Sequence, residues 1–129
     1  MAVIIKPINA KNAPETAGGY SQAIDVTNSS RRLYISGQIP VDQNGNLPES
    51  FAEQAGNAWS NVKAQLNAAN MTIENLVKIT IFLADRKYNQ ENRDARAAAL
   101  NGIRPALTVV ITDIFDESWL LEIEGVAEA

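Results

Sequence analysis

Apolar residues recur every three or four positions between residues 50 and 70, the spacing of an amphipathic helix that packs against a core. Ser50 and Glu53 begin this stretch as a capping box, because the hydroxyl can accept from one free backbone amide and the carboxylate can reach back to another. Asn70 can adopt the left-handed conformation that ends a helix. We therefore predict a helix here, and its apolar face consists of Phe51, Ala55, Trp59, Val62, Leu66 and Ala69.

A second helix is predicted from about Tyr88 to Leu100, where Gly102 and Pro105 stop it. Its apolar face is weak, because the residues that would form it are small. They are Ala95, Ala98 and Ala99.

Alternating apolar positions predict the strands. The clearest is Val77–Leu83, whose odd-numbered residues are all apolar and would share one face. The polar run Thr27–Ser30 separates two other strands and is a hairpin signal, and Asn44-Gly45 marks a turn. The predicted strands are Val3–Lys6, Tyr20–Val26, Arg32–Ser36, Val77–Leu83, Leu107–Thr112 and Leu120–Val126.

Two of these strands indicate that the chain associates with copies of itself. Two helices can cover only one face of a sheet of about six strands. The run from Leu107 to Ile111 is apolar on both faces, and Phe82 adds an apolar residue to the second face of its own strand. The uncovered face then needs another chain, which predicts a homo-oligomer. The alternative is that Phe82 and Val110 lie singly on a wet surface, which is common.

Length and composition limit the chemistry. The 129 residues fit one domain, 1–129, and the hydrophobic fraction of 46% is ordinary for a globular protein. The sequence contains neither Cys nor His. Disulfides, thiolate nucleophiles, thiolate metal sites and serine–histidine catalysis are therefore excluded. No loop has acidic residues at calcium-binding spacing, so we expect no metal site.

The charge pattern argues against nucleic acid and membranes as partners. Eleven basic and fifteen acidic residues give a net charge of −4, and the only paired bases are Arg31-Arg32 and Arg86-Lys87, which we interpret as solvated strand ends or turns. The apolar run at residues 1–6 is too short for a signal peptide, and none approaches the roughly 20 residues of a membrane span. We expect a cytoplasmic protein.

Ten short segments, each unspecific alone, form an ordered set from about Ala13 to Val126. They are Ala13-Pro14, Tyr20-Ser21-Gln22-Ala23, Ser36-Gly37-Gln38-Ile39-Pro40, Glu53-Gln54, Asn61-Val62-Lys63, Val77-Lys78, Phe82-Leu83-Ala84-Asp85, Asn92, Arg104-Pro105-Ala106 and Glu122-Ile123-Glu124. Taken in this order, the set resembles the RidA (YjgF-type) family, formerly called endoribonuclease L-PSP.

The resemblance implies an α+β fold like that of the trimeric bacterial chorismate mutase. Two helices would lie on one face of a mixed six-stranded sheet, and the strands of three chains would form a central barrel. It also implies a homotrimer with a small-molecule cleft at each subunit boundary. In active relatives this cleft hydrolyses 2-imino or 2-enamino acids to 2-keto acids and ammonia, without a cofactor.

The resemblance assigns one catalytic residue, Glu122, which matches the glutamate that orients or activates water in the family's cleft. A carboxylate in a water-poor cleft has a raised pKa and can exchange protons nearer neutrality. Without the resemblance, Glu122 and Glu124 would be two harmless acids on the solvent side of one strand.

The same resemblance places further residues around the ligand. Tyr20 matches the aromatic lining of the cleft, although it could equally serve strand packing. Gly37 matches the backbone that approaches the ligand closely, although it could be a simple turn glycine. Ser36 and Asn92 match polar groups in or beside the cleft, and Asn92 could instead be a surface helix residue. Val109 is expected to line the cleft.

Leu107 is the main departure from the family. Deaminases of the family read Pro-Ala-Arg where this chain reads Pro105-Ala106-Leu107, and their arginine binds the substrate carboxylate through a fork of two hydrogen bonds. Leucine cannot bind an anion. Arg104 should point to the other face, so we do not expect it to substitute. Gly19 stands where the family usually has proline, which loosens the loop before Tyr20.

Three functions follow, in order of preference. The first is a divergent RidA-like hydrolase that acts on an imine or enamine other than a simple 2-imino acid. The second is a non-catalytic trimer that binds a ligand or partner in the same cleft. The third is an endoribonuclease or translation inhibitor, ranked last because the chain is acidic and has no histidine for RNA cleavage.

Overall fold

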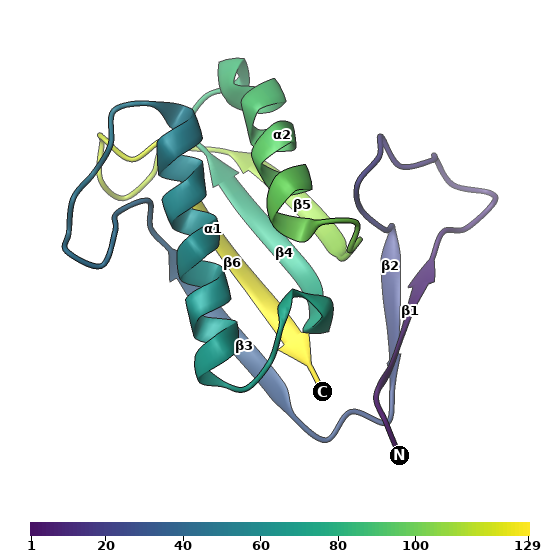
Figure 1. Ribbon diagram of the computed structural model, residues 1–129. Coiled ribbons are helices and arrows are strands. Elements are labelled where there is room, and N and C mark those ends of the chain that lie inside the picture. The colour runs from purple at the N-terminus through teal and green to yellow at the C-terminus, as the bar shows by residue number, and fades with distance from the viewer.

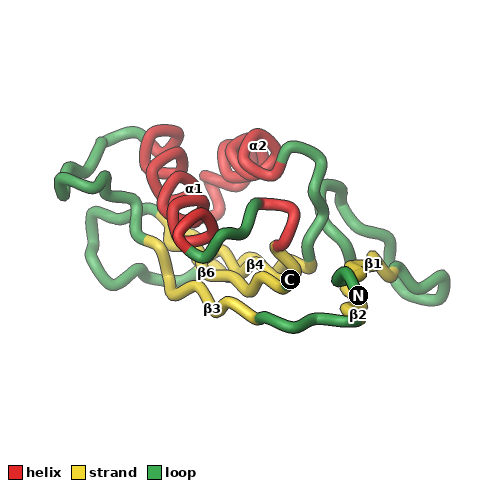
Figure 2. The backbone as a smooth tube through the Cα atoms, turned by 60° about the horizontal axis from the view of Figure 1, so that its bottom comes forward, coloured by secondary structure: helices red, strands yellow, loops and turns green.

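The computed structural model describes residues 1–129, and a four-stranded mixed sheet forms its centre. The strands lie in the order β3 (Arg32–Gln38), β6 (Leu121–Glu128), β4 (Leu76–Leu83) and β5 (Ala106–Ile111). β6 pairs antiparallel with both of its neighbours, whereas β4 and β5 run parallel. Figure 1 shows both helices in front of this sheet, and Figure 2 shows them as one layer on one side of the strands. The predicted α+β fold is therefore confirmed.

The two helices are positioned by signals that the sequence carries. α1 (Phe51–Ala68) is capped by Ser50, whose Oγ accepts from the Glu53 amide at 3.2 Å. The Glu53 carboxylate accepts from the Ser50 hydroxyl at 3.0 Å, where we expected it to reach the backbone. α2 (Asn89–Leu100) ends at Asn101, which adopts the left-handed conformation at φ 46°.

The core lies between the helices and the sheet. Side chains alternate along a strand, so every second residue of β4 and β6 faces the helices and is excluded from solvent. α1 supplies the other half of this core from its apolar stripe, as its spacing predicted. The fully buried side chains include Val62, Leu66, Ile79, Ile81, Leu83, Leu121 and Ile123.

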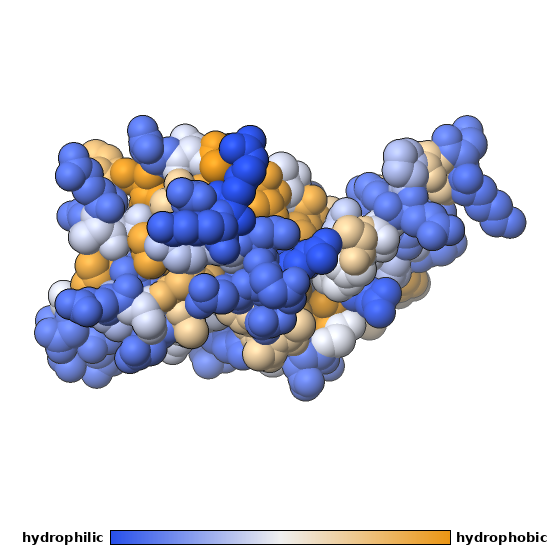
Figure 3. Space-filling model, turned by 90° about the horizontal axis from the view of Figure 1, so that it is seen from above, coloured by the Kyte–Doolittle hydropathy of each residue, from blue (hydrophilic) through white to orange (hydrophobic).

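The N-terminal strands depart from the prediction of one six-stranded sheet. β1 (Ile4–Ile8) and β2 (Ala23–Thr27) pair with each other as a separate two-stranded sheet, at the side of the body near β5. In the space-filling view from above, a lobe projects on this same side (Figure 3). The predicted hairpin between the second and third strands is therefore wrong, because β2 and β3 have different partners.

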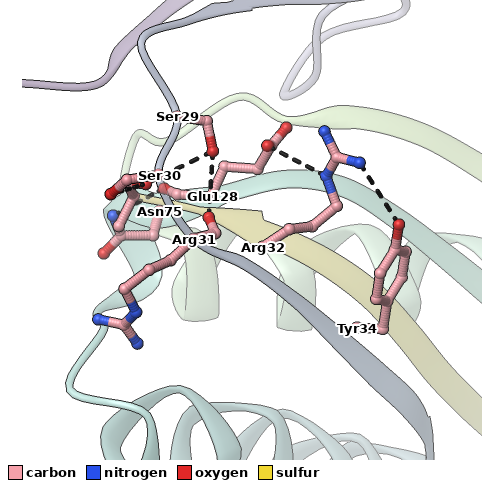
Figure 4. Close-up of polar contacts among 8 residues, drawn as sticks. Ser29, Ser30, Arg31, Arg32, Tyr34, Asn75 and Glu128 are labelled. Atoms are coloured by element: carbon pink, nitrogen blue, oxygen red, sulfur yellow. Dashed lines mark hydrogen bonds and ion pairs between the residues drawn. The ribbon is translucent and has the colours of Figure 1, made fainter.

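The connection between β2 and β3 explains this difference. The Ser30 and Arg31 amides both donate to the Ala129 carbonyl at 2.8 Å, and the Ala129 amide donates back to the Arg31 carbonyl. The chain thus pairs with the C-terminal strand before β3 begins, and it does not turn back onto β2. Figure 4 shows this junction, where Arg32 also forms an ion pair of 3.1 Å with Glu128.

The second face of the four-stranded sheet has no layer over it (Figure 2). Its side chains are the even-numbered residues of β4 and β6, which are half-buried or exposed through most of their length. Apolar side chains are left open on it, as the two-faced strand pattern predicted: Tyr34 is 72% exposed and Val110 is 37% exposed. No helix of the chain is both long and apolar enough to cross a membrane.

Candidate functional site

Glu122 lies on the open face of the sheet, in β6. Its register partner on β4 is Phe82, and the loop after β5 borders the same pocket. These elements form a pocket of about 320 Å³ that Glu122 borders, and the carboxylate side chain is half-buried in it. The pocket is lined by Phe82, Thr112, Asp113, Ile114, Phe115 and Glu122.

Gly37 lies directly beside this carboxylate. A Cβ built on Gly37 would lie 1.9 Å from Oε2 of Glu122, so the carboxylate rests against the Gly37 backbone, and any other residue at position 37 would force the end of the Glu122 side chain to move. The pairing of β3 with β6 shifts register between Ile35 and Gln38, which is where Gly37 lies. Such bulges commonly redirect side chains next to sites. Ser36 precedes it and is exposed.

Tyr20 lies at the opposite edge of the sheet. The next residue, Ser21, forms an isolated parallel bridge with Ala106, and its hydroxyl donates to the Arg104 carbonyl at 2.6 Å. These bonds fasten the half-buried Tyr20 beside the start of β5. Its hydroxyl accepts a weak hydrogen bond from the Ala17 amide at 3.4 Å.

Leu107 and Val109 face the helices. In β5 they lie opposite Ile79 and Ile81, which are fully buried, and both pack against the core as partly buried residues. Glu122 points to the other side of the same sheet. One chain therefore does not bring Leu107 and Glu122 into a common cleft. A cleft that contains both Leu107 and Glu122 stays a prediction, and it would have to be formed by two chains.

Asn92 is not a surface residue. Its side chain is 0% exposed on the sheet side of α2, and neither its amide oxygen nor its amide nitrogen has a hydrogen-bond partner in the chain. Unsatisfied buried amides are uncommon in proteins, because each one loses its bonds to water. Asn92 is therefore a buried polar residue whose side chain has no hydrogen-bond partner within the chain.

Arg96 is a candidate that the sequence reasoning missed. It follows Asn92 by one helical turn, on the same buried face of α2, and it is only 5% exposed. The sequence did carry a signal, because position 96 falls in the apolar stripe between Asn92 and Ala99, where an arginine is out of place. The apolar residues of this helix face are all alanines, so the pattern was too weak to show that the arginine interrupts it.

Acidic residues do not gather into a metal site. No group of three or more Asp or Glu side chains lies close enough together to hold a metal ion.

The comparisons with known proteins place the chain in a family. The sequence profile of the family described as Endoribonuclease L-PSP matches residues 10–129. The chain belongs to this family. The RidA resemblance is thereby confirmed, since the solved structures that match it include members of the Rid family.

Two relatives of known sequence cover most of this L-PSP family chain. Protein HMF1 of Saccharomyces cerevisiae is 33% identical over 128 residues, which is 98% of this chain and 97% of the yeast protein. The 2-iminobutanoate/2-iminopropanoate deaminase of Rattus norvegicus is 37% identical over 110 residues, which is 75% of this chain and 78% of the rat protein.

Solved structures show the same fold. The Rid family protein YyfB of Yersinia pestis superposes with a TM-score of 0.85 at 23% identity, covering 97% of this chain and 98% of YyfB. The yeast protein YEO7 superposes with a TM-score of 0.72 at 32% identity, covering 97% of this chain and 98% of its own. The architecture is thus shared across the family at low identity.

Proposed function

We propose that this chain is a divergent RidA-like hydrolase that cleaves an imine or enamine metabolite other than a simple 2-imino acid. It acts without a cofactor, in clefts between the subunits of a cytoplasmic homotrimer. The observation that carries this proposal is the Glu122 carboxylate, held against the Gly37 backbone beside Phe82 in a pocket of about 320 Å³. The similarity of this chain to the 2-iminobutanoate/2-iminopropanoate deaminase of the rat supports the reaction class.

The chemistry needs one proton carrier. The substrate reacts as the protonated imine. Glu122 accepts a proton from a bound water as the water oxygen attacks the carbon of the C=N bond, which gives a neutral carbinolamine. The carboxylic acid then returns this proton to nitrogen, and the carboxylate takes up the hydroxyl proton as the carbonyl forms and ammonia leaves. Glu122 finally passes that proton to ammonia or solvent and is a carboxylate again. For an enamine, protonation of the carbon precedes these steps. A positioned carboxylate of this kind contributes about 10²–10⁴ to the rate.

The open face of the sheet supports the proposed assembly. Apolar side chains on that face, including Phe82 and Val110, are incompletely covered within one chain. A copy of the chain laid on this face would bury them. It would also bring a second edge of the molecule, where Tyr20 lies, toward Glu122.

Leu107 sets the limit on the substrate. It packs against the core and offers no charge to an acid attached directly to the imine carbon. Because it faces the core, an arginine placed there would also disturb packing, so Leu107→Arg is a poor test of function.

The matched pair Glu122→Gln and Glu124→Gln tests the proposal. Both residues lie on the open face of β6, two positions apart, and only Glu122 borders the pocket. Ammonia release is measured from imines that an amine oxidase generates in situ, and from 2-aminoacrylate. We expect Glu122→Gln to lower release from the amine-derived imines by about 10²–10⁴, Glu124→Gln to leave it unchanged, and 2-aminoacrylate to react slowly. Equal activity of Glu122→Gln and wild type would overturn the proposal.

A further inference from the structure

Arg96 is a buried cation without a counter-ion. It is 5% exposed, and the one ion pair of the chain joins two other residues, Arg32 and Glu128. A guanidinium carries five N–H donors, and those of Arg96 have only their residual contact with solvent in place of a partner in the chain. A charge removed from water costs free energy unless it is paired, so this arrangement is expensive for a chain that needs it only to fold.

The surroundings of Arg96 are also free of negative charge. Burial and the neighbouring positive charge of Arg93 lower the pKa of Arg96, and the only group with the opposite effect is Tyr20. The guanidinium carbon lies 6.0 Å from the centre of the Tyr20 ring, over its face. An aromatic face stabilises a cation in place and leaves its N–H groups available.

Asn92 adds a second unpartnered polar group beside the first. It lies one turn earlier on the same face of α2, is 0% exposed, and has both amide atoms without partners. A carboxylate accepts hydrogen bonds from both kinds of donor, the guanidinium fork and the amide N–H. The Arg96 guanidinium and the Asn92 amide nitrogen are therefore adjacent donors without an acceptor, while Oδ1 of Asn92 lacks a donor.

Two glycines lie in the segment next to Arg96. Gly18 and Gly19 have positive φ angles of 107° and 78°, and a Cβ on Gly19 would lie 3.6 Å from Nη2 of Arg96. The residues around them, from Asn9 to Gly19, are almost all exposed. A glycine pair can adopt several backbone conformations at little cost, so a small ligand would reach the guanidinium by displacing this segment.

We propose that Arg96 is the anion-binding residue of this protein, and that its ligand carries a carboxylate that is not attached to the imine carbon. This inference rests on the proposed function for the reaction class, but the binding itself can be measured without it. Arg96, Tyr20 and Leu107 all lie on the helix side of the β5 edge. The arginine that is absent at position 107 is thus replaced by one from the helix above, which holds the acid at a different point.

Butanoate and its uncharged isostere butanamide are the probes. We expect butanoate to bind the wild-type protein at millimolar concentrations and to raise its Tm, while butanamide does neither, because only the anion pairs with the guanidinium. Arg96→Met should weaken butanoate binding by about thirtyfold or more in a calorimetric titration. Arg86→Gln removes an exposed arginine of the same charge and should bind like wild type.

The stability of the variant separates a binding role from a structural one. Without ligand, Arg96→Met should melt at the wild-type temperature or higher, because it removes an unpaired buried charge. A large drop in Tm, or a change in oligomeric mass, would overturn the proposal, because it would mean that Arg96 holds the fold or the assembly together. Equal butanoate binding by both proteins would also overturn it. Glu122→Gln should lose hydrolysis and still bind butanoate. Hydrolysis that persists in Glu122→Gln, with butanoate binding intact, would count against the proposed reaction alone.

Discussion

The two faces of the four-stranded sheet are made by alternate residues of the same strands, yet they differ in almost every respect. On the helix side, Ile79, Ile81 and Ile123 are completely buried in the core. On the open side, Phe82 is only half-buried and Glu124 is exposed. One chain therefore completes one face and leaves the other to be completed by contact with something else.

The difference separates the residues that serve folding from those of the candidate site. Glu122 lies on the incomplete face, where its half-buried carboxylate keeps access to a small pocket. The complete face still contains buried polar side chains that bond to nothing within the chain, among them Asn92 and Arg96 on α2. Polar groups in a finished core that satisfy nothing within the chain are better explained by a ligand than by stability.

The largest effect that separates the two faces should come from Ile81→Ala. This change removes a fully buried side chain from the covered face and should lower the free energy of unfolding by about 2–5 kcal/mol, since the cavity cannot collapse between α1 and the sheet. Urea unfolding gives the value. The neighbouring change Phe82→Ala, on the open face, should cost the isolated chain less, and equal losses at both positions would abolish the distinction.

A smaller effect, on assembly rather than folding, is expected from Val110→Lys. Val110 is 37% exposed on β5 and belongs to the apolar part of the open face. A lysine there should weaken association by on the order of 1–3 kcal/mol per interface, because its amine must either lose water or reach past the neighbouring chain. Sedimentation should then show the mass falling toward the 14.0 kDa of one chain. An unchanged mass would mean that this face is covered by something other than a copy of the chain.

Much of the covered face could be predicted from the sequence, because its signals are local. The apolar stripe from Phe51 to Leu66 gave the long helix, and the alternation in Val77–Leu83 gave the central strand with its buried side. The position of β2 could not be predicted in this way. A polar linker is compatible with either a hairpin or an extended crossing, and bonds to Ala129, one hundred residues away, decide between them.

The candidate site was predictable in part for the same reason. Glu122 and Gly37 come from motifs far apart in the chain, and only the register of β3 with β6 reveals that the carboxylate rests on the glycine. Arg96 belongs to no motif, and it becomes a candidate only because its buried guanidinium has no ion-pair partner in the chain. Missing partners cannot be read from a sequence, because they depend on every element that packs around the residue.

The smallest effect should come from the cap of α1, and it tests whether folding and assembly are separable. Ser50→Ala removes the hydroxyl that accepts from the Glu53 amide, which should lower the free energy of unfolding by about 1 kcal/mol. Ser50→Asp keeps an acceptor at the same position and should be close to wild type. Because α1 lies on the covered side, neither variant should alter the mass in solution. If Ser50→Ala dissociates the assembly in proportion to its loss of stability, the covered layer and the open face are coupled, and the division of labour between them does not hold.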